Sequence, residues 1–453
     1  MAGSFVDADY PARRQSADFW KFWAGQTISN LGSSITLLAL PLLIFELTGS
    51  PLNLALASAS YFVPYLLFGL IIGAWTDRVD RKRLMIVTDI ARALVIASIP
   101  LLGALDLLSA WWIYGVQFVG STLSICFDAA QFAAIPSLVS RKDLVTANGR
   151  IQASYSAASV IGPLLAGLLA AAMPIHTILV LDSLSFLISA FSLALIGMSF
   201  NVRTESDART AQAGAGVAAC DSSFEDRASS RASLRGDIVE GLRYVLGHPV
   251  LRSISIMMAL VNFLSCTVYA QLVFFAKERL QASDAELGVL YAAGSIGVIV
   301  LSLAAGRLRE RLSFSSVALG PLMLEGLLTV LLALTSTYWI AVAVWGLHSG
   351  VSILFNINTS SLRQTIAPSY LLGRVVSIAG VLAWSAIPAG TLVGGFVIEQ
   401  TKNVALVYGV IGALVFLIAV GFSFTAVGHA ERYVLEGRGP LGDAMSPPFR
   451  ADY

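Results

Sequence analysis

Three acidic residues of this sequence fall inside long apolar stretches. Asp128, Asp182 and Glu325 each have mainly apolar neighbours on both sides. Ionisable side chains at membrane depth are costly, face the interior of a helix bundle, and often bind ions or protons. Because a carboxyl group can take up and release one proton, these three residues are candidates for proton coupling.

Two of these carboxyl groups, and one further acid, also allow a structural interpretation. Asp182 opens Asp-Ser-Leu-Ser-Phe, which favours a structural hydrogen-bonding role over coupling. Glu325 has no base near it in sequence, so it is either a proton site or a polar residue without an explanation. Asp89 and Arg92 lie one helical turn apart, which predicts a structural pair.

Polar side chains also recur at helical spacing, which places them on one face of a helix. In a bilayer such a stripe must face protein or a water-filled cavity. We expect the stripes, together with Trp384, to line a cavity for a small molecule. The alternative is that they hold neighbouring helices together. The stripes comprise Gln26, Asn30, Ser33 and Ser34; Gln117, Ser121, Ser124 and Asp128; and His348, Ser352, Asn356, Thr359 and Arg363.

The elements that carry these residues are membrane-spanning helices. Of the 453 residues, 56% are hydrophobic and 13% are charged, and the mean hydropathy is +0.76. A soluble protein would have about 25% charged residues. At about 20 apolar residues per span, the sequence predicts twelve helices near 20–46, 52–75, 84–104, 111–135, 151–173, 176–199, 250–275, 286–306, 314–335, 338–362, 374–397 and 403–426. No cleavage site follows the first span, so we expect it to remain in the mature protein.

Lysine and arginine predict the orientation of these spans. If the N-terminus is cytoplasmic, all but four of the 29 Lys and Arg residues lie on the cytoplasmic side, as the positive-inside rule requires. We therefore expect both termini in the cytoplasm. The predicted domains are a head at 1–18, a six-helix half at 19–199, a linker at 200–249 with an amphipathic helix near 234–246, a second six-helix half at 250–427, and a tail at 428–453.

A cluster of charges separates the second span from the third. Its sequence is Gly73-Ala-Trp-Thr-Asp77-Arg78-Val-Asp80-Arg81-Lys-Arg83. It resembles the loop motif of the major facilitator superfamily, and the variant with aspartate at Asp80 resembles the branch of enterobactin exporters and macrolide efflux pumps. The resemblance covers residues from about 19 to 427. It implies twelve helices in two pseudo-symmetric halves and alternating access to a central cavity.

The resemblance also implies roles for the residues of this motif. Gly73, Asp77, Arg78, Arg81 and Arg83 would form an inner gate. Asp77 would lie against the N-terminus of the eleventh helix, near 373–374, where backbone N–H groups favour an anion. Asp128 would pair with Arg81 or another base of the loop as a latch; a proton site and inert packing remain its alternatives.

A second motif lies in the fifth span. Gly162, Pro163 and Gly167 resemble the helix-bending motif of proton-coupled drug exporters, since proline removes a backbone hydrogen bond and glycine allows close helix approach. Many of those exporters also carry an arginine in the fourth span, where this chain has Gln117 as its nearest polar residue.

Several classes of function are excluded by the motifs that the sequence lacks. There is no Gly-x-x-x-x-Gly-Lys-Ser/Thr loop for ATP, no nucleophile motif, and no histidine or cysteine spacing for a metal. We expect no enzyme activity, no cofactor and no nucleic-acid partner. The predicted function is export of a small organic molecule (drug, macrolide or siderophore-like) by a monomer in the bacterial inner membrane, driven by the proton gradient. The alternatives are an uptake symporter, a membrane sensor that does not transport, or a lipid-handling protein.

Overall fold

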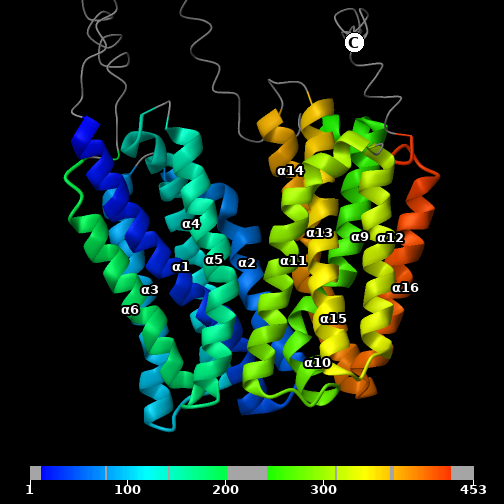
Figure 1. Ribbon diagram of the computed structural model, residues 1–453, viewed down its shortest axis with the longest axis horizontal. Helices are drawn as coiled ribbons and strands as arrows, with labels where there is room; N and C mark the ends of the chain where they lie inside the picture. Colours follow the sequence, from blue (N-terminus) through cyan, green and yellow to red (C-terminus); the bar gives the residue numbers. More distant parts are fainter. Residues whose placement is uncertain are drawn as a thin grey trace, which may run out of the picture. The chain divides into compact units, whose positions relative to one another are not determined.

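The protein is all-helical wherever its structure is described. The computed structural model describes residues 12–76, 79–140, 143–198, 200, 242–311, 314–367 and 372–429 (Figure 1). Within these residues, eleven helices are long and apolar enough to cross a membrane, and Leu319–Leu334 adds a shorter apolar helix. The predicted fold class, an all-α polytopic membrane protein, is confirmed.

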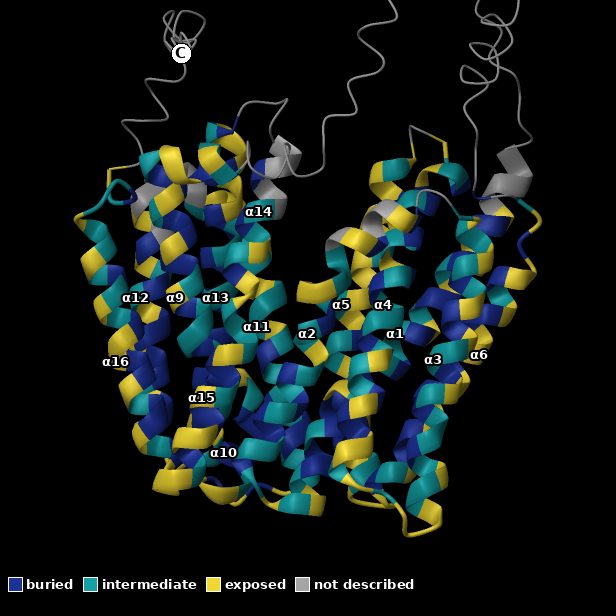
Figure 2. Cartoon of the chain, turned by 180° about the vertical axis from the view of Figure 1, so that it is seen from behind, coloured by how far each residue is buried: buried dark blue, intermediate teal, exposed yellow. Residues whose placement is uncertain are grey.

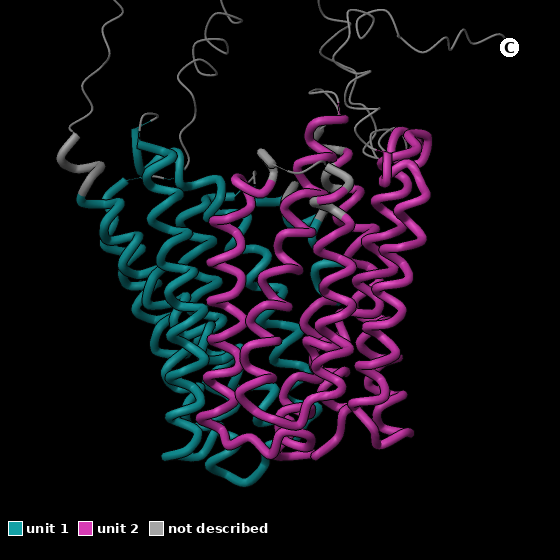
Figure 3. The backbone as a smooth tube through the Cα atoms, turned by 45° about the vertical axis from the view of Figure 1, so that its right-hand side comes forward, with its two compact units in different colours: residues 1–43, 63–231 teal, residues 44–62, 232–453 magenta. Residues whose placement is uncertain are grey.

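The chain divides into two compact units, which Figure 3 shows in different colours. Unit 1 comprises residues 1–43 and 63–231, and unit 2 comprises residues 44–62 and 232–453. The division therefore passes through the end of the first helix and through the second helix. Residues 44–62 belong to the same unit as the C-terminal helices.

In unit 1, helices that are distant in sequence pack together as well as neighbours along the chain. The helix α3 packs most extensively against α6 and then against α4. The helices are α1 (Ala12–Thr48), α2 (Pro51–Thr76, of which residues 51–62 belong to unit 2), α3 (Arg81–Ala104), α4 (Ala110–Leu138), α5 (Leu144–Ala170) and α6 (Ile175–Ala194).

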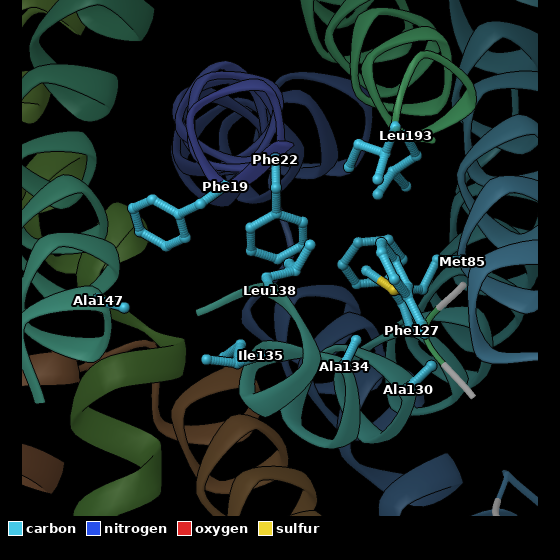
Figure 4. Packing of buried hydrophobic residues seen from close by; sticks show 12 residues of the cluster. Phe19, Phe22, Met85, Phe127, Ala130, Ala134, Ile135, Leu138, Ala147 and Leu193 are labelled. Carbon is cyan, nitrogen blue, oxygen red and sulfur yellow. The ribbon is translucent and has the colours of Figure 1, made fainter. Parts of the chain in front are cut away.

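Aromatic and small side chains fill the core of unit 1 near the start of α3 (Figure 4). Phe19 and Phe22 of α1 meet Phe127 of α4, and Met85 of α3 packs in the same cluster. Alanines on α4 let the neighbouring helices approach closely, because a methyl group fills little of the space between them. This core fixes the first turns of α3, which follow the charged loop.

Unit 2 has the same all-helical construction. The pairs α12–α16 and α11–α13 pack most extensively, and α9 packs on α15. The helices are α9 (Pro249–Ala270), α10 (Leu272–Glu278), α11 (Asp284–Arg311), α12 (Phe314–Leu334), α13 (Tyr338–Ile366), α14 (Leu372–Trp384), α15 (Ala386–Thr401) and α16 (Val404–Ser423).

Two predicted spans of unit 2 are interrupted. The eleventh span breaks at Ser385 into α14 and α15 because Pro388, four residues after Trp384, cannot donate a backbone hydrogen bond to it. The seventh breaks at Gln271 between α9 and α10. The buried Gln271 donates from Nε2 to the carbonyl oxygen of Pro51 at 2.7 Å, which anchors the first residues of α2 within this unit.

Apolar side chains face outward along helices of both units, as they must in a bilayer (Figure 2). Leu184, Ile188 and Phe191 of α6 are exposed in this way. Most of the linker, including the start of the expected amphipathic helix, lies outside the described residues. Its described part, 242–247, is helical, and Val245 is buried against Leu251 and Val375.

Candidate functional site

The charged loop motif ends in the first turn of α3. Asp80 caps this helix, because its carboxylate accepts a hydrogen bond from the backbone N–H of Arg83 at 2.9 Å. An acidic cap accepts a hydrogen bond from an N–H that has no partner within the helix. Its negative charge also interacts favourably with the positive end of the helix dipole. This role explains an aspartate at the position of Asp80. Arg83 itself is exposed.

The bases of this first turn contact the ends of other helices in unit 1. Arg81 Nη1 donates to the carbonyl oxygens of Ala133 at 3.2 Å and of Phe200 at 3.5 Å. Lys82 Nζ donates to the carbonyl of Ile196 at 2.5 Å. Cations are favoured near helix C-termini, so these contacts tie α3 to the ends of α4 and α6.

Part of the predicted inner gate lies outside what the structure describes. Asp77 and Arg78 are outside the described residues, and Gly73 is placed only as part of helix α2. Asp128 is exposed on α4, and the charge of Arg92 acts on it. The pairing of Asp128 with Arg81, and the contact of Asp77 with the eleventh span, therefore stay predictions.

Arg92 of α3 places a positive charge beside α4, whose own sequence has no Lys or Arg. Its Nη2 donates to Ser124 Oγ at 2.8 Å, and its Nη1 lies 3.5 Å from Asp89 Oδ1. The guanidinium also lies over two aromatic rings: its Cζ is 4.3 Å from the ring centroid of Phe186 and 5.4 Å from that of Phe127. Cation–π contacts of this kind stabilise a partly desolvated arginine. Sequence reasoning placed Arg92 beside Asp89 but missed its contact with the α4 stripe.

Asp182 is buried between α6 and α1 and receives hydroxyl donors. Thr36 Oγ1 donates to Oδ2 at 2.5 Å, and Ser33 Oγ and Ser185 Oγ donate to Oδ1 at 3.4 and 3.3 Å. Hydrogen bonds to an ionised acceptor are stronger than neutral ones. Hydroxyl groups of α1 and α6 are therefore the hydrogen-bond partners of Asp182, and its role in proton coupling stays a prediction.

The polar stripe of α1 lies against protein at several positions. Gln26 Nε2 donates to Ser189 Oγ on α6 at 2.9 Å, and both residues are buried. Ser34 is buried beside Gly162 of α5, where an added Cβ would meet the Ser34 backbone carbonyl carbon at 2.8 Å. Gly162 therefore permits the close approach of α5 to α1. Pro163 and Gly167 are also buried, and α5 continues as a helix through them.

The other candidate residues of the α4 stripe are partly enclosed. Ser121 is buried, and Gln117 Oε1 is buried without a hydrogen-bond partner. Asn30 of α1 is half-buried. Because these positions do not show a cavity, the role of these residues in lining one stays a prediction.

Glu325 is buried inside unit 2 without a neutralising charge. Only 1% of its surface is exposed, and Oε1 accepts a hydrogen bond from Ser265 Oγ of α9 at 3.1 Å. Its Oε2 has no hydrogen-bond partner, and no cation among the described residues acts on it. Gly326 lets α16 pack directly over this point, since an added Cβ would lie 2.7 Å from the Gly412 carbonyl oxygen.

The α13 stripe forms the other wall around Glu325. Ser352 lies within side-chain reach of both the Glu325 carboxyl and the Tyr269 hydroxyl. His348 is fully buried, stacked on Trp345 at 5.2 Å and 5.7 Å from the Tyr269 ring, and neither ring nitrogen has a hydrogen-bond partner. Sequence reasoning missed Tyr269, because an aromatic residue in an apolar helix carries no signal of its own.

The remaining candidates of unit 2 lie apart from Glu325. Asn356 Nδ2 donates to the Ser352 carbonyl at 3.0 Å, within its own helix. Thr359 and Arg363 are buried nearer the end of α13, where Arg363 contacts Met258. Trp384, at the end of α14, is 56% exposed. Across the described residues, no group of His, Cys, Asp or Glu could hold a metal ion.

The sequence matches one family model and several proteins of known function. Residues 11–434 match the family described as transmembrane secretion effectors. The chain is 25% identical over 388 residues to macrolide efflux protein A of Streptococcus pyogenes, covering 84% of this chain and 89% of that protein. It is 28% identical over 384 residues to the multidrug efflux pump Tap of Mycolicibacterium fortuitum, covering 80% of this chain and 85% of the pump.

Solved structures share the fold. A bacterial homologue of the human lysosomal transporter Spinster, in an inward-facing and unoccupied conformation, has a TM-score of 0.67 at 14% identity and covers 96% of this chain and 99% of that chain. The nucleoside transporter NupG has a TM-score of 0.69 at 11% identity and covers 89% and 98%. At these identities the likeness is one of fold.

Proposed function

Because the chain belongs to the transmembrane secretion effector family of the major facilitator superfamily, we propose that it exports a small organic molecule and is driven by the proton gradient. It is a multi-pass membrane transporter and not an enzyme. The proposed mechanism is alternating access, with one or more protons entering as substrate leaves. Export as the direction is supported by the two relatives, which are an efflux protein and an efflux pump.

The observation that carries proton coupling is the environment of Glu325. A buried ionised carboxylate without a partner costs several kcal/mol even after relaxation of the protein. Glu325 has a hydrogen bond from Ser265, the hydroxyl of Ser352 within reach, and no cation acting on it among the described residues. It is therefore most stable in its protonated, neutral form. A transport cycle that exposes this carboxyl to water would let it release the proton and take up another.

The substrate class that we propose is an amphiphilic drug, macrolide or siderophore-like compound. The candidate cavity residues, such as Ser352, Asn356 and Gln117, offer hydrogen bonds without a fixed charge, and Trp384 offers an exposed aromatic surface. Sites of this composition suit molecules with a large apolar surface and a few polar groups. We further propose that a monomer in the bacterial plasma membrane performs the transport, with both termini in the cytoplasm.

The test is accumulation of radiolabelled erythromycin and of fluorescent amphiphiles in bacteria that express the protein. We expect lower accumulation than in control cells, and we expect a protonophore to abolish the difference. Glu325→Gln, expressed at the same level, serves as the matched control, because glutamine resembles the protonated acid but cannot release the proton. It should leave accumulation close to that of control cells.

The other outcomes would contradict specific parts of the proposal. Higher accumulation in expressing cells would reverse the direction and indicate uptake. Lower accumulation that a protonophore leaves intact would remove the proton gradient as the driving force. No change with any compound would remove broad drug efflux.

A further inference from the structure

Asp89 of α3 is a buried acid that the proposed function does not use. Its side chain is completely buried, and neither carboxyl oxygen has a hydrogen-bond partner in the described part of the chain. Its polar contact is Arg92 Nη1, 3.5 Å from Oδ1. Ser189 of α6 lies within side-chain reach, and because its Oγ accepts the hydrogen bond from Gln26, its own hydroxyl proton points to another acceptor such as Asp89. An ionised carboxyl so poorly solvated is costly.

The neighbouring cation is shared among several acids. Arg92 binds Ser124 of α4, and its charge acts on Asp89, Asp128 and Asp182. Around Asp89, α6 therefore contributes Asp182, whereas Asp128 of α4 interacts with the same guanidinium. The ionisable pair of α1, Asp18 and Lys21, lies nearer the start of that helix and is closed on itself at 2.9 Å.

Three carboxyl groups cannot all be balanced by one guanidinium. Asp182 has hydroxyl donors from α1 and from its own helix, and the surface of Asp128 is more exposed, so each depends less on Arg92 than Asp89 does. Asp89 is completely buried, and Arg92, at 3.5 Å, and the Ser189 hydroxyl are the groups that reach it. Of the three, it gains the most from binding a proton.

We propose that Asp89 is a proton-binding site of unit 1 and that Arg92 is the counter-ion released when the proton binds. The proton adds to one carboxylate oxygen of Asp89 and leaves a neutral carboxyl group. The positive charge of Arg92 is then available to Asp128 or Asp182. Arg92, whose side chain is 14% exposed, is the group that links the buried Asp89 to the surface of unit 1.

The site is distinct from Glu325, which belongs to unit 2, and it rests on the proposed function only for its role in transport. Binding of a proton to Asp89 can be measured without any substrate. A chain that exports erythromycin but has no titrating Asp89 would overturn this inference alone. A titrating Asp89 in a chain that exports nothing would leave the inference standing and remove the proposed function.

The experiment is infrared difference spectroscopy of the purified full-length protein in lipid, between acidic and alkaline buffer. The background is Glu325→Gln, which removes the carboxyl signal of that residue. We expect a band from a protonated, buried carboxyl group that disappears at alkaline pH. Asp89→Asn should abolish the band, whereas Asp182→Asn and Asp128→Asn should retain it.

The other possible spectra either support the proton-binding site at Asp89 or overturn it. Absence of a titrating band in the Glu325→Gln background, or a band that survives Asp89→Asn, would overturn the proposal. Since asparagine could impair folding, Asp89→Glu provides a second readout, and it should retain the band at a shifted frequency. A band unchanged in frequency in Asp89→Glu would assign it elsewhere and overturn the proposal.

Discussion

Unit 1 and unit 2 each bury acidic side chains between helices, but they stabilise them in different ways. Asp182 of unit 1 has three hydroxyl donors, and Arg92 lies among the acids around it. Glu325 of unit 2 has the hydroxyls of Ser265 and Ser352 within reach, and no cation among the described residues acts on it. The first environment therefore stabilises an ionised carboxylate more than the second does. The surroundings, and not the residue type, therefore decide which acid can carry a proton.

The largest effect is expected from removing the cation of unit 1. Arg92→Met leaves the buried Asp89 without its ion-pair partner and should lower the free energy of unfolding by about 3–5 kcal/mol, the usual cost of breaking a buried ion pair. Thermal unfolding of the purified protein at neutral pH would measure it. Adding Asp89→Asn should restore part of the loss, because one uncompensated acid is then gone. If Arg92→Met is as stable as the wild type, the contrast between the units is wrong.

A smaller effect is expected from removing a hydroxyl donor to the ionised acid of unit 1. Thr36→Val keeps the shape of the side chain but deletes the 2.5 Å hydrogen bond to Asp182. A hydrogen bond to a charged group contributes about 1.5–3 kcal/mol, so the unfolding temperature should fall clearly. Thr27→Val is the control, because Thr27 of the same helix donates only to the Trp23 carbonyl. Equal losses for the two variants would mean that Asp182 is neutral.

The smallest effect is expected from the corresponding change in unit 2. Ser265→Ala deletes the hydroxyl that donates to Glu325. If Glu325 is neutral, the loss should be about 0.5–1.5 kcal/mol, as for an ordinary hydrogen bond. Ser255→Ala of the same helix is the control, because Ser255 Oγ is buried without a partner and its removal should cost little. A loss for Ser265→Ala as large as that for Thr36→Val would indicate an ionised Glu325.

Much of the fold follows from the sequence because spans and charges are strong local signals. Runs of about 20 apolar residues can satisfy their backbone only as helices in a bilayer, and the observed helices lie close to the predicted ones. The interruption at Ser385 was missed, although Pro388 is a local signal for it. The family resemblance carried by residues 73–83 is confirmed by the match over residues 11–434.

The candidate site could be predicted less well from the sequence, because it depends on contacts between segments that are distant along the chain. The face of α4 that carries Ser124 gave no sign that Arg92, 32 residues earlier, would bind it. Likewise, the isolation of Glu325 could be suspected from its neighbours in sequence, but the absence of a cation is a property of the packed helices α9, α12 and α13. Tyr269 became a candidate only because this packing places it close to Ser352 and His348.

The most direct test of proton coupling at Glu325 is transport by proteoliposomes that contain either wild type or Glu325→Gln. The substrate is the compound whose accumulation the protein lowers in cells. Two rates are compared: transport driven by an imposed pH gradient, and exchange of labelled for unlabelled compound without a gradient. We predict that Glu325→Gln retains exchange and loses gradient-driven transport. Retention of gradient-driven transport at the wild-type rate would contradict the assignment of Glu325 as the proton carrier.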